Sequence, residues 1–455
     1  MFNRGNYKSK YLEYNGQREK SQRDSLCHAP FQNLLFVQSG NMMVCHYNRA
    51  FSLGSFPEVS ITEAWNGQRI AELRKSVGKY EIQPGCRYCG DEIAAGNFLS
   101  AGCKKYDYLA GPKSAYPQIM EFQTSNRCNL ECIMCSGEYS SAIRQNREQG
   151  APYPDPYDER FFMALQGFLP HLKYASFTGG EPFLNEMYYR IWKEIASVNP
   201  ALHITISTNG TILNERVKEV LSSLNVQLTV SIDSIRKQTY EHIRRNASFE
   251  EVQDNLRFFI EFMKQNNRLF SVKFVVMQEN IREIPEVFSF FHEQEVQLFP
   301  KPAWVPFGQT LRFLEPGILE GHIDFLNSFS FEGGSAVRDF NRERYLELIN
   351  TLKQWRNERL SFSRTALEAL PDEELEGKLF EMVKQSVEKD EMISQTEKSV
   401  LVETSAQALD ALLLTTPVKE ERRALVLKVL LLPAFMVINE LYRNNKEKFV
   451  MRFRN

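Results

Sequence analysis

The chain has few of the features that mark membrane, secreted or nucleic-acid-binding proteins. Its longest apolar stretch, 424–438, contains Lys428 and Pro433. It falls short of the roughly 18 apolar residues that a membrane span needs, so we expect a buried helix there, with a partner-binding or membrane-surface helix as the alternative. Lys and Arg total 55 against 57 Asp and Glu, which leaves no strong positive field for nucleic acid. These absences favour a globular cytoplasmic protein that binds neither membranes nor nucleic acid.

The first 26 residues also lack a hydrophobic segment that would serve as a secretory signal. They carry more Lys and Arg than Asp and Glu, and we expect residues 1–26 to form a flexible, solvated basic tail. Cysteine is missing from the last 320 of the 455 residues, because all eight lie between Cys27 and Cys135. Thiols in a chain without a secretory signal stay reduced. Metal binding therefore explains their clustering better than disulfides do.

Three cysteines, Cys128, Cys132 and Cys135, follow an apolar strand-like run with the spacing Cys-x3-Cys-x2-Cys. Structural zinc and iron–sulfur sites normally have four protein ligands, so three thiolates leave such a site incomplete. An iron–sulfur cluster held by this triad keeps one iron open for another ligand. The alternatives are three unrelated buried thiols or part of a zinc knuckle.

An apolar strand near 174–178 runs into the turn Gly179-Gly180-Glu181-Pro182. Glycines allow the backbone to approach a ligand closely, and a carboxylate accepts a charge-assisted hydrogen bond from an ammonium group. By itself, the turn is equally well an ordinary connection from a strand to a helix. After a cysteine triad it indicates a ligand site.

Polar residues follow two further strands of the same pattern: Thr208-Asn209 end one, and Ser231 and Asp233 end the next. Ligands bind at the carboxyl ends of strands in parallel α/β sheets, so these residues are candidates for binding. A helix N-cap is the alternative role of Asp233.

Taken together, the triad and these strand ends resemble the radical S-adenosylmethionine (SAM) enzymes. The resemblance implies a 4Fe–4S cluster whose open iron chelates SAM, and an electron that cleaves SAM to a 5′-deoxyadenosyl radical, which abstracts hydrogen from a substrate. It also implies a one-electron donor such as flavodoxin or ferredoxin. The residues expected to contact SAM are the following: Met134 near the adenine, where the family often has an aromatic residue, Gly179, Gly180 and Glu181 at the methionyl amine, Thr208, Asn209, Ser231 and Asp233 at strand ends, and Arg244 at the carboxylate.

The other five cysteines precede the triad. A Gly40-x4-Cys45 segment, a Trp65-Asn66 pair and a Cys86-x2-Cys89 pair resemble the auxiliary-cluster module called SPASM, or its shortened form, twitch. The resemblance implies a second iron–sulfur cluster with four ligands: Cys27, Cys45, Cys86 and Cys89. We expect Cys27 and Cys45 on paired strands joined by a turn at 39–41, and a helix over 61–75. A zinc site with four cysteine ligands is the alternative, and Cys103 is either a fifth ligand or an inert buried thiol.

Strand and helix patterns alternate from 118 to about 306, which indicates βαβ units and a parallel sheet. We therefore predict an α/β protein: a partial (βα)6 barrel at 116–310, preceded by the cysteine-rich module at 27–115 and followed by a helical region at 311–455. Strands are expected near 118–125, 174–178, 203–207, 227–232, 271–277 and 296–299, and helices near 158–169, 185–197, 214–223, 249–265 and 281–293. The proline-rich segment 136–158 is expected to be a loop.

The resemblance implies that the chain is a radical SAM oxidoreductase or maturase. Its favoured substrate is a peptide or protein side chain, by analogy with enzymes that carry the auxiliary module. A radical dehydrogenase or rearrangement enzyme for a carbohydrate or other small molecule is the alternative. A non-catalytic, metal-stapled binding protein is disfavoured by the intact triad and the Gly-Gly-Glu turn.

Overall fold

The structure, a computed structural model, describes residues 4–48, 51–81, 84–94, 96, 98, 101–303, 306, 308–361, 367–388, 395–432 and 437. The described residues include one nine-stranded sheet of order β3-β2-β1-β4-β5-β6-β7-β8-β9. The strands are β1 (Asn33–Val37), β2 (Asn41–Met43), β3 (Gly54–Ser55), β4 (Ile119–Gln123), β5 (Tyr174–Phe177), β6 (His203–Thr208), β7 (Val226–Ser231), β8 (Phe270–Val276) and β9 (Gln297–Pro302).

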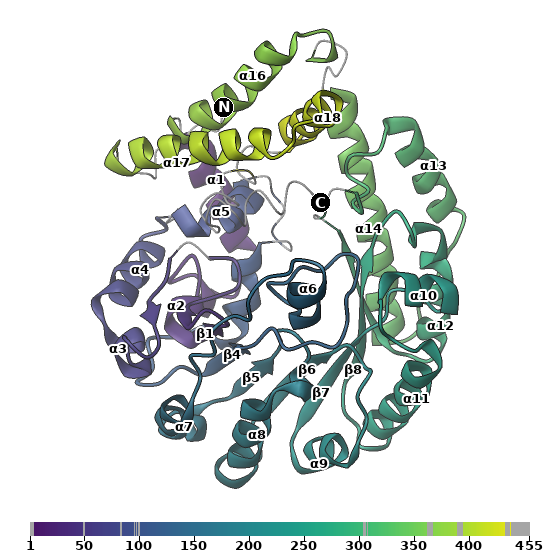
Figure 1. Cartoon of the computed structure of the whole chain (residues 1–455). Helices are drawn as coiled ribbons and strands as arrows, with labels where there is room; N and C mark the ends of the chain where they lie inside the picture. Colours follow the sequence, from purple (N-terminus) through teal and green to yellow (C-terminus); the bar gives the residue numbers. More distant parts are fainter. Residues whose placement is uncertain are drawn as a thin grey trace.

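Strands β1 and β4 to β9 are parallel to one another, whereas β2 and β3 run antiparallel to their neighbours. The sheet curves into an open barrel, and helices cover its outer, convex side (Figure 1). These helices are α7 (Glu159–Gln166), α8 (Glu186–Val198), α9 (Glu215–Ser223), α10 (Lys237–Ile243), α11 (Phe249–Gln265) and α12 (Ile284–Glu293). The predicted α/β partial barrel is confirmed, with β4 to β9 as its six strands.

The two faces of the sheet differ in polarity because successive side chains of a strand point to opposite sides. On the outer face, Phe122, Phe177 and Ile206 stand in register on β4, β5 and β6, and all three are fully buried against the helices. On the inner face, Ser176 and Thr205 occupy the neighbouring register and are only half-buried. The core therefore lies between sheet and helices, and the inner face remains accessible.

The segment 136–158 contains a helix that the sequence did not suggest. Helix α6 (Ser141–Asn146) begins where the Ser140 side chain accepts a hydrogen bond from the backbone N–H of Ile143. The expectation of a continuous loop there was wrong, because a serine N-cap was overlooked beside the prolines that follow. In Figure 1, α6 lies on the concave side of the sheet.

The cysteine-rich module shares the sheet of the barrel. Strand β1 pairs in parallel with β4, and β1 and β2 form the expected hairpin around Gly40, whose φ is +86°. Cys27 and Cys45 flank this hairpin rather than lie on its paired strands, which corrects our expectation. The expected helix at 61–75 is divided at Gly67. The module's helices are α2 (Ala29–Gln32), α3 (Ile61–Asn66), α4 (Gln68–Gly78) and α5 (Arg87–Ala94).

The expectation of a flexible N-terminal tail was wrong for residues 4–26. Helix α1 (Arg4–Gly16) packs beside α5, and Tyr14 is fully buried. Arg18 is also buried, and its guanidinium donates two hydrogen bonds to Asp107, at 2.9 and 2.7 Å. A partner almost ninety positions away thus orders a segment that local composition marks as a tail.

The C-terminal region is helical, as predicted, where it is described. Its helices are α13 (Pro316–Asn327), α14 (Ala336–Ser361), α16 (Asp372–Glu388), α17 (Gln395–Leu414) and α18 (Lys419–Leu430). Helix α14 covers the edge strand β9. The Asn341 side chain accepts a hydrogen bond from the N–H of Leu298 and donates one to the C=O of Val296, both at 2.9 Å. An amide side chain thus takes the place of a further strand at this edge.

Helices α16, α17 and α18 form a second hydrophobic cluster of their own. The apolar stretch 424–438 begins inside α18, where Val426 and Val429 are buried, as expected for a buried helix. Residues 433–436 and 438 of that stretch lie outside the described residues. No helix within the described ranges has the length and apolar character to cross a membrane.

Candidate functional site

The cysteine triad lies in the loop that follows β4. Backbone hydrogen bonds join this loop to the end of α10: Ile133 donates to Ile243 at 2.9 Å, and Glu131 donates to Arg245 at 3.0 Å. Helix α6 fixes the start of the loop, because the Ser141 hydroxyl accepts from the N–H of Cys128 at 3.1 Å. Two elements outside the sheet therefore hold the triad at the carboxyl ends of the strands.

The three thiols influence one another. Burial raises the pKa of Cys135 to about 12, and the neighbouring thiols of Cys132 and Cys128 contribute. Burial also raises the pKa of Cys132 to about 11, although the Arg244 guanidinium acts against it. Buried thiols with high pKa values remain protonated unless a cation replaces the proton. The thiols are therefore close enough for each to influence the ionisation of another.

Among the residues that the structure describes, no three His, Cys, Asp or Glu side chains meet at the spacing of a single bound metal ion. In an iron–sulfur cluster each cysteine binds a different iron, so its thiolates need not converge on one point. Three mutually close thiols beside the Arg244 cation fit such a cluster.

The Gly-Gly-Glu turn lies directly against the start of the triad loop. Gly179 and Gly180 have φ values of +83° and +46°. A Cβ on Gly180 would lie 2.2 Å from the carbonyl oxygen of Arg127, the residue before Cys128. Glycine is therefore required at Gly180 both by its backbone conformation and by the approach of the loop.

The turn places Glu181 at the ends of β5 and β6. Its carboxylate accepts hydrogen bonds from the Thr208 hydroxyl and the Asn209 backbone N–H, both at 2.7 Å, and one from the Phe183 N–H. Burial nevertheless raises the pKa of Glu181 to about 7, against these hydrogen bonds and the nearby Arg244 guanidinium. A buried carboxylate of this kind gains from a cationic ligand.

Asn209 connects this cluster to the triad. Its side-chain amide donates to the Sγ of Cys128 at 3.9 Å and to the side chain of Asn129 at 3.0 Å. The structure therefore brings Glu181, Thr208 and Asn209 together beside the first cysteine.

Asp233 and Arg244 form a buried ion pair, with 2.8 Å between the guanidinium nitrogen and the carboxylate oxygen. The other oxygen of Asp233 accepts from the backbone N–H of Val275 at 2.6 Å. Burial alone would lower the pKa of Arg244, but Asp233 and the Cys132 thiol raise it, so the guanidinium stays charged. The sequence suggested both residues separately and gave no sign that they pair. The alternative N-cap role of Asp233 is not seen, because the next helix, α10, has Arg236 as its N-cap.

Met134 and Ser231 occupy the margins of the site. Met134 packs against a small buried cluster of Ile133, Ile243 and Met277. Ser231 ends β7, on the inner face of the sheet, and is half-buried.

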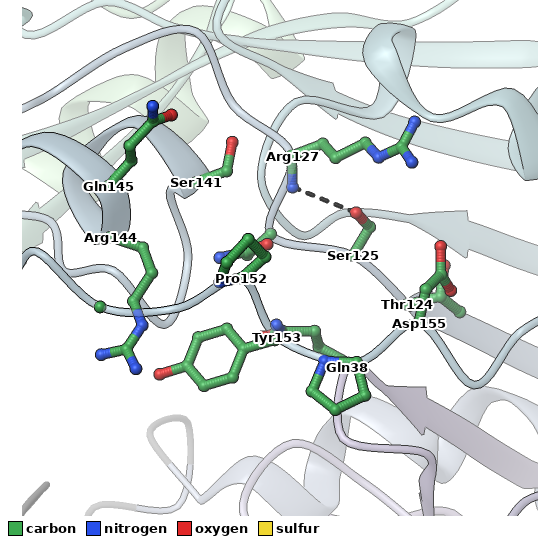
Figure 2. Close-up of a pocket in the computed structure, with 13 residues that line it drawn as sticks. Gln38, Thr124, Ser125, Arg127, Ser141, Arg144, Gln145, Pro152, Tyr153 and Asp155 are labelled. Carbon is green, nitrogen blue, oxygen red and sulfur yellow. Dashed lines mark hydrogen bonds between the residues drawn. The ribbon is translucent and has the colours of Figure 1, made fainter.

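A cavity of about 500 Å³ opens at the ends of β1 and β4, beside the triad. Its wall includes Ser141, which also hydrogen-bonds the C=O of Cys128 at 3.2 Å, and Gln38, which follows β1. Figure 2 shows Arg144 of α6 next to Tyr153, and the guanidinium carbon lies 4.9 Å from the ring centroid. The segment after the triad thus forms one wall of a ligand-sized space.

The five cysteines of the N-terminal module are close together. The pKa of the Cys27 thiol is raised well above its ordinary value by burial and by Cys103, Cys45 and Cys86. A hydrogen bond with Cys103, together with burial, raises the pKa of the Cys89 thiol well above its ordinary value. Cys103, expected to be a fifth ligand or an inert thiol, is thus part of the same group.

Polar groups that the sequence did not single out surround these thiols. The side-chain amide of Asn48 donates to Cys86, and its backbone N–H donates to Cys45, both at 3.3 Å. The Tyr14 hydroxyl lies 3.4 Å from the Sγ of Cys103. Hydrogen bonds to cluster sulfurs tune reduction potentials, so these contacts suit an iron–sulfur site.

Sequence reasoning also missed Glu121, which is buried in the middle of β4 on the inner face. Asn33 donates to it at 2.8 Å, Tyr106 at 3.1 Å, and Lys105 forms an ion pair with it. Burial would raise the pKa of Glu121, but Lys105 and His46 lower it below its ordinary value. The sequence did contain one sign of this buried carboxylate, because Glu121 is a single acidic residue inside an apolar strand.

Comparison with protein families matches two regions of the chain. Residues 122–291 match the model of the radical SAM superfamily. Residues 27–90 match the SPASM model, described as an iron–sulfur cluster-binding domain. The two matches contain the triad and four of the five other cysteines, in the order expected from the sequence.

Curated proteins with similar sequences include the GTP 3′,8-cyclase of Clostridium acetobutylicum, 24% identical over 30% of this chain and 41% of that protein. The AdoMet-dependent heme synthase of Methanosarcina barkeri is 24% identical over 39% of this chain and 48% of that protein. The matched region thus spans less than half of either relative.

Similar solved structures include native anSMEcpe with bound AdoMet, at 19% identity and a TM-score of 0.35, over 46% of this chain and 60% of that one. Streptococcus suis SuiB bound to precursor peptide SuiA matches at 16% identity and a TM-score of 0.34, over 57% of this chain and 56% of that one. Scores at this level carry no argument about activity.

Proposed function

Because this chain belongs to the radical SAM superfamily and carries a SPASM iron–sulfur domain, we propose that it cleaves SAM reductively and abstracts a hydrogen atom from a peptide or protein side chain. The observation that carries the proposal is the group of three mutually close thiols beside a buried Glu181 and Arg244. The chain is thus a radical SAM enzyme, and we infer an oxidoreductase or maturase reaction.

Cys128, Cys132 and Cys135 hold the SAM-binding cluster in this proposal. The bound cluster and SAM supply a one-electron cleavage that yields a 5′-deoxyadenosyl radical. The chain itself orients SAM and excludes water. The carboxylate of Glu181 accepts a hydrogen bond from the methionyl amino group, and this partner offsets part of the cost of burying Glu181.

The other proposed SAM contacts follow from the positions of the residues around the triad and the strand ends. Gly179 and Gly180 bring the backbone next to the ligand, and Thr208 and Asn209 hold Glu181 in place. Ser231 and Asp233 lie toward the ribose, and Met134 packs near the adenine. Arg244 attracts the SAM carboxylate while Asp233 fixes its guanidinium.

Cys27, Cys45, Cys86 and Cys89 hold the auxiliary cluster, with Cys103 as a candidate fifth ligand. Hydrogen abstraction would leave a substrate radical, and a cluster held by these thiols would supply the acceptor for the second electron of a two-electron oxidation. A flavodoxin or ferredoxin in the cytoplasm provides the first electron.

The peptide substrate rests on the SPASM domain, which resembles modules of peptide-modifying enzymes. A small-molecule substrate is the second candidate, and one observation favours it. The curated relatives include several GTP 3′,8-cyclases, whose name states a nucleotide substrate.

Anaerobic reconstitution tests the proposal. The protein should carry about eight irons if both sites hold 4Fe–4S clusters. With SAM and dithionite it should form 5′-deoxyadenosine, and the triple variant C128A/C132A/C135A should not. With deuterated candidate peptides, deuterium should appear in the 5′-deoxyadenosine. A wild-type protein whose triad binds iron but never cleaves SAM would refute the proposal.

A further inference from the structure

The inner face of the barrel carries two lysines on adjacent strands. Lys273 of β8 and Lys301 of β9 lie diagonally across the two strands on the same face of the sheet. This face is opposite the one that carries the buried Phe274 and Leu298. Both lysine side chains are exposed, while the inner-face hydroxyl residues Thr229 and Ser231 are half-buried. The inner face therefore presents two ammonium groups among neutral polar groups.

Register places these lysines beside the proposed SAM contacts. Lys273 is the cross-strand neighbour of Ser231, and Lys301 is that of Val275. The backbone N–H of Val275 in turn holds Asp233. Adjacent strands lie about 4.8 Å apart, so a group bound by the lysines would lie next to SAM.

The carboxylates near the lysines are already engaged. Asp233 is paired with Arg244 at 2.8 Å, Glu347 with Arg344 at 2.8 Å, and Glu121 with Lys105. Among the described residues, no carboxylate lies within ion-pair distance of Lys273 or Lys301.

Electrostatics agree with this arrangement. Although Lys273 is exposed, surrounding protein lowers its pKa, and so do the charges of Lys301 and Lys105. Surrounding protein likewise lowers the pKa of Lys301 and Arg344 adds to the effect, while Glu347 acts against it. Neighbouring like charges destabilise each other, and a bound anion removes that repulsion.

We propose that Lys273 and Lys301 form an anion-binding pair that holds a carboxylate or phosphate group of the substrate beside SAM. This proposal rests on the proposed function, because it assigns the substrate an anionic group and a place on the inner face. It makes the two lysines positioning and specificity residues.

Isothermal titration of the reconstituted, full-length protein under anaerobic conditions tests the pair with two probes, phenyl phosphate and glutarate. The wild type should bind at least one of them, and K273M/K301M should bind it about tenfold more weakly or worse, because two charge-assisted contacts are lost. K273R/K301R keeps both charges and should retain binding. K193M, which removes an exposed lysine of α8 on the convex side, should bind like the wild type.

Preference for phenyl phosphate indicates a phosphorylated substrate, and preference for glutarate indicates a carboxylate. Failure of the wild type to bind either probe, or equal binding by K273M/K301M, overturns the anion site. Formation of 5′-deoxyadenosine by the wild type is measured separately. Its absence alongside lysine-dependent binding would overturn the proposed function and leave the anion site standing.

Discussion

Arg244 and Asp233 are joined by a 2.8 Å ion pair in which both side chains are almost completely buried. The pair connects the end of β7, which Asp233 follows, to the residue after α10, and Val275 of β8 also hydrogen-bonds Asp233. Because Arg244 also lies beside the Cys132 thiol, the pair links the strand ends to the triad. A change at either residue should therefore affect both folding and the site.

Arg244→Met should lower the free energy of unfolding by about 3–5 kcal/mol, because it leaves the Asp233 carboxylate buried without a partner. Asp233→Asn combined with Arg244→Met should recover part of this loss, since no uncompensated charge remains. Urea denaturation followed by circular dichroism measures both variants against the wild type.

Arg236→Met is the matched control for that comparison. Arg236 pairs with Glu286 at an exposed position, where water screens the charges. Its loss should leave the free energy of unfolding nearly unchanged. Equal effects of Arg236→Met and Arg244→Met would show that the buried pair has no special role in stability.

Glu181 should make the stability of the cofactor-free protein depend on pH. Burial raises its pKa to about 7 from an ordinary value of 4.5, so the folded state binds a proton that the unfolded state has lost between these values. Stability should fall as pH rises through this window, by up to about 3 kcal/mol. Glu181→Gln should remove most of this fall in urea denaturation at pH 5 and pH 8.

SAM binding should show the opposite trend, because ionised Glu181 accepts a hydrogen bond from the ligand's amino group more strongly than the neutral acid does. The affinity of the wild type should rise as pH increases toward 8, and that of Glu181→Gln should stay flat. Glu186→Gln is the control, since Glu186 is an exposed partner of Arg216. An identical pH response in Glu181→Gln and the wild type would mean that Glu181 does not titrate in this range.

Local patterns in the sequence were sufficient to predict the barrel. Helix α11 occupies Phe249–Gln265, the range that its apolar periodicity predicted. The meeting of Glu181 with Thr208 followed from a general rule, because parallel strands end at one edge of the sheet. The cysteine module likewise lay where its spacing indicated.

Contacts between distant segments could not be predicted in the same way. Tyr14 and Arg18 are buried because they meet Cys103 and Asp107, and composition near residue 14 contains no sign of those partners. The pairing of Arg244 with Asp233 depends on how α10 is oriented against the sheet. Periodicity does not specify that orientation, so the sequence suggested two separate ligand contacts.

The auxiliary thiols should be separable from SAM cleavage. The variant C86A/C89A removes two thiols of the N-terminal group and leaves the triad loop, which α6 and α10 hold, unchanged. Iron content should fall from about eight to about four per chain. Formation of 5′-deoxyadenosine and deuterium transfer into it should persist, while the oxidised peptide product should not form, because no acceptor remains for the second electron. C103A is the comparison, since an inert thiol there leaves the iron content unchanged and a true ligand lowers it.

Loss of 5′-deoxyadenosine formation in C86A/C89A would instead assign the auxiliary site a scaffolding role, because the first cluster would then depend on the second for its place in the fold.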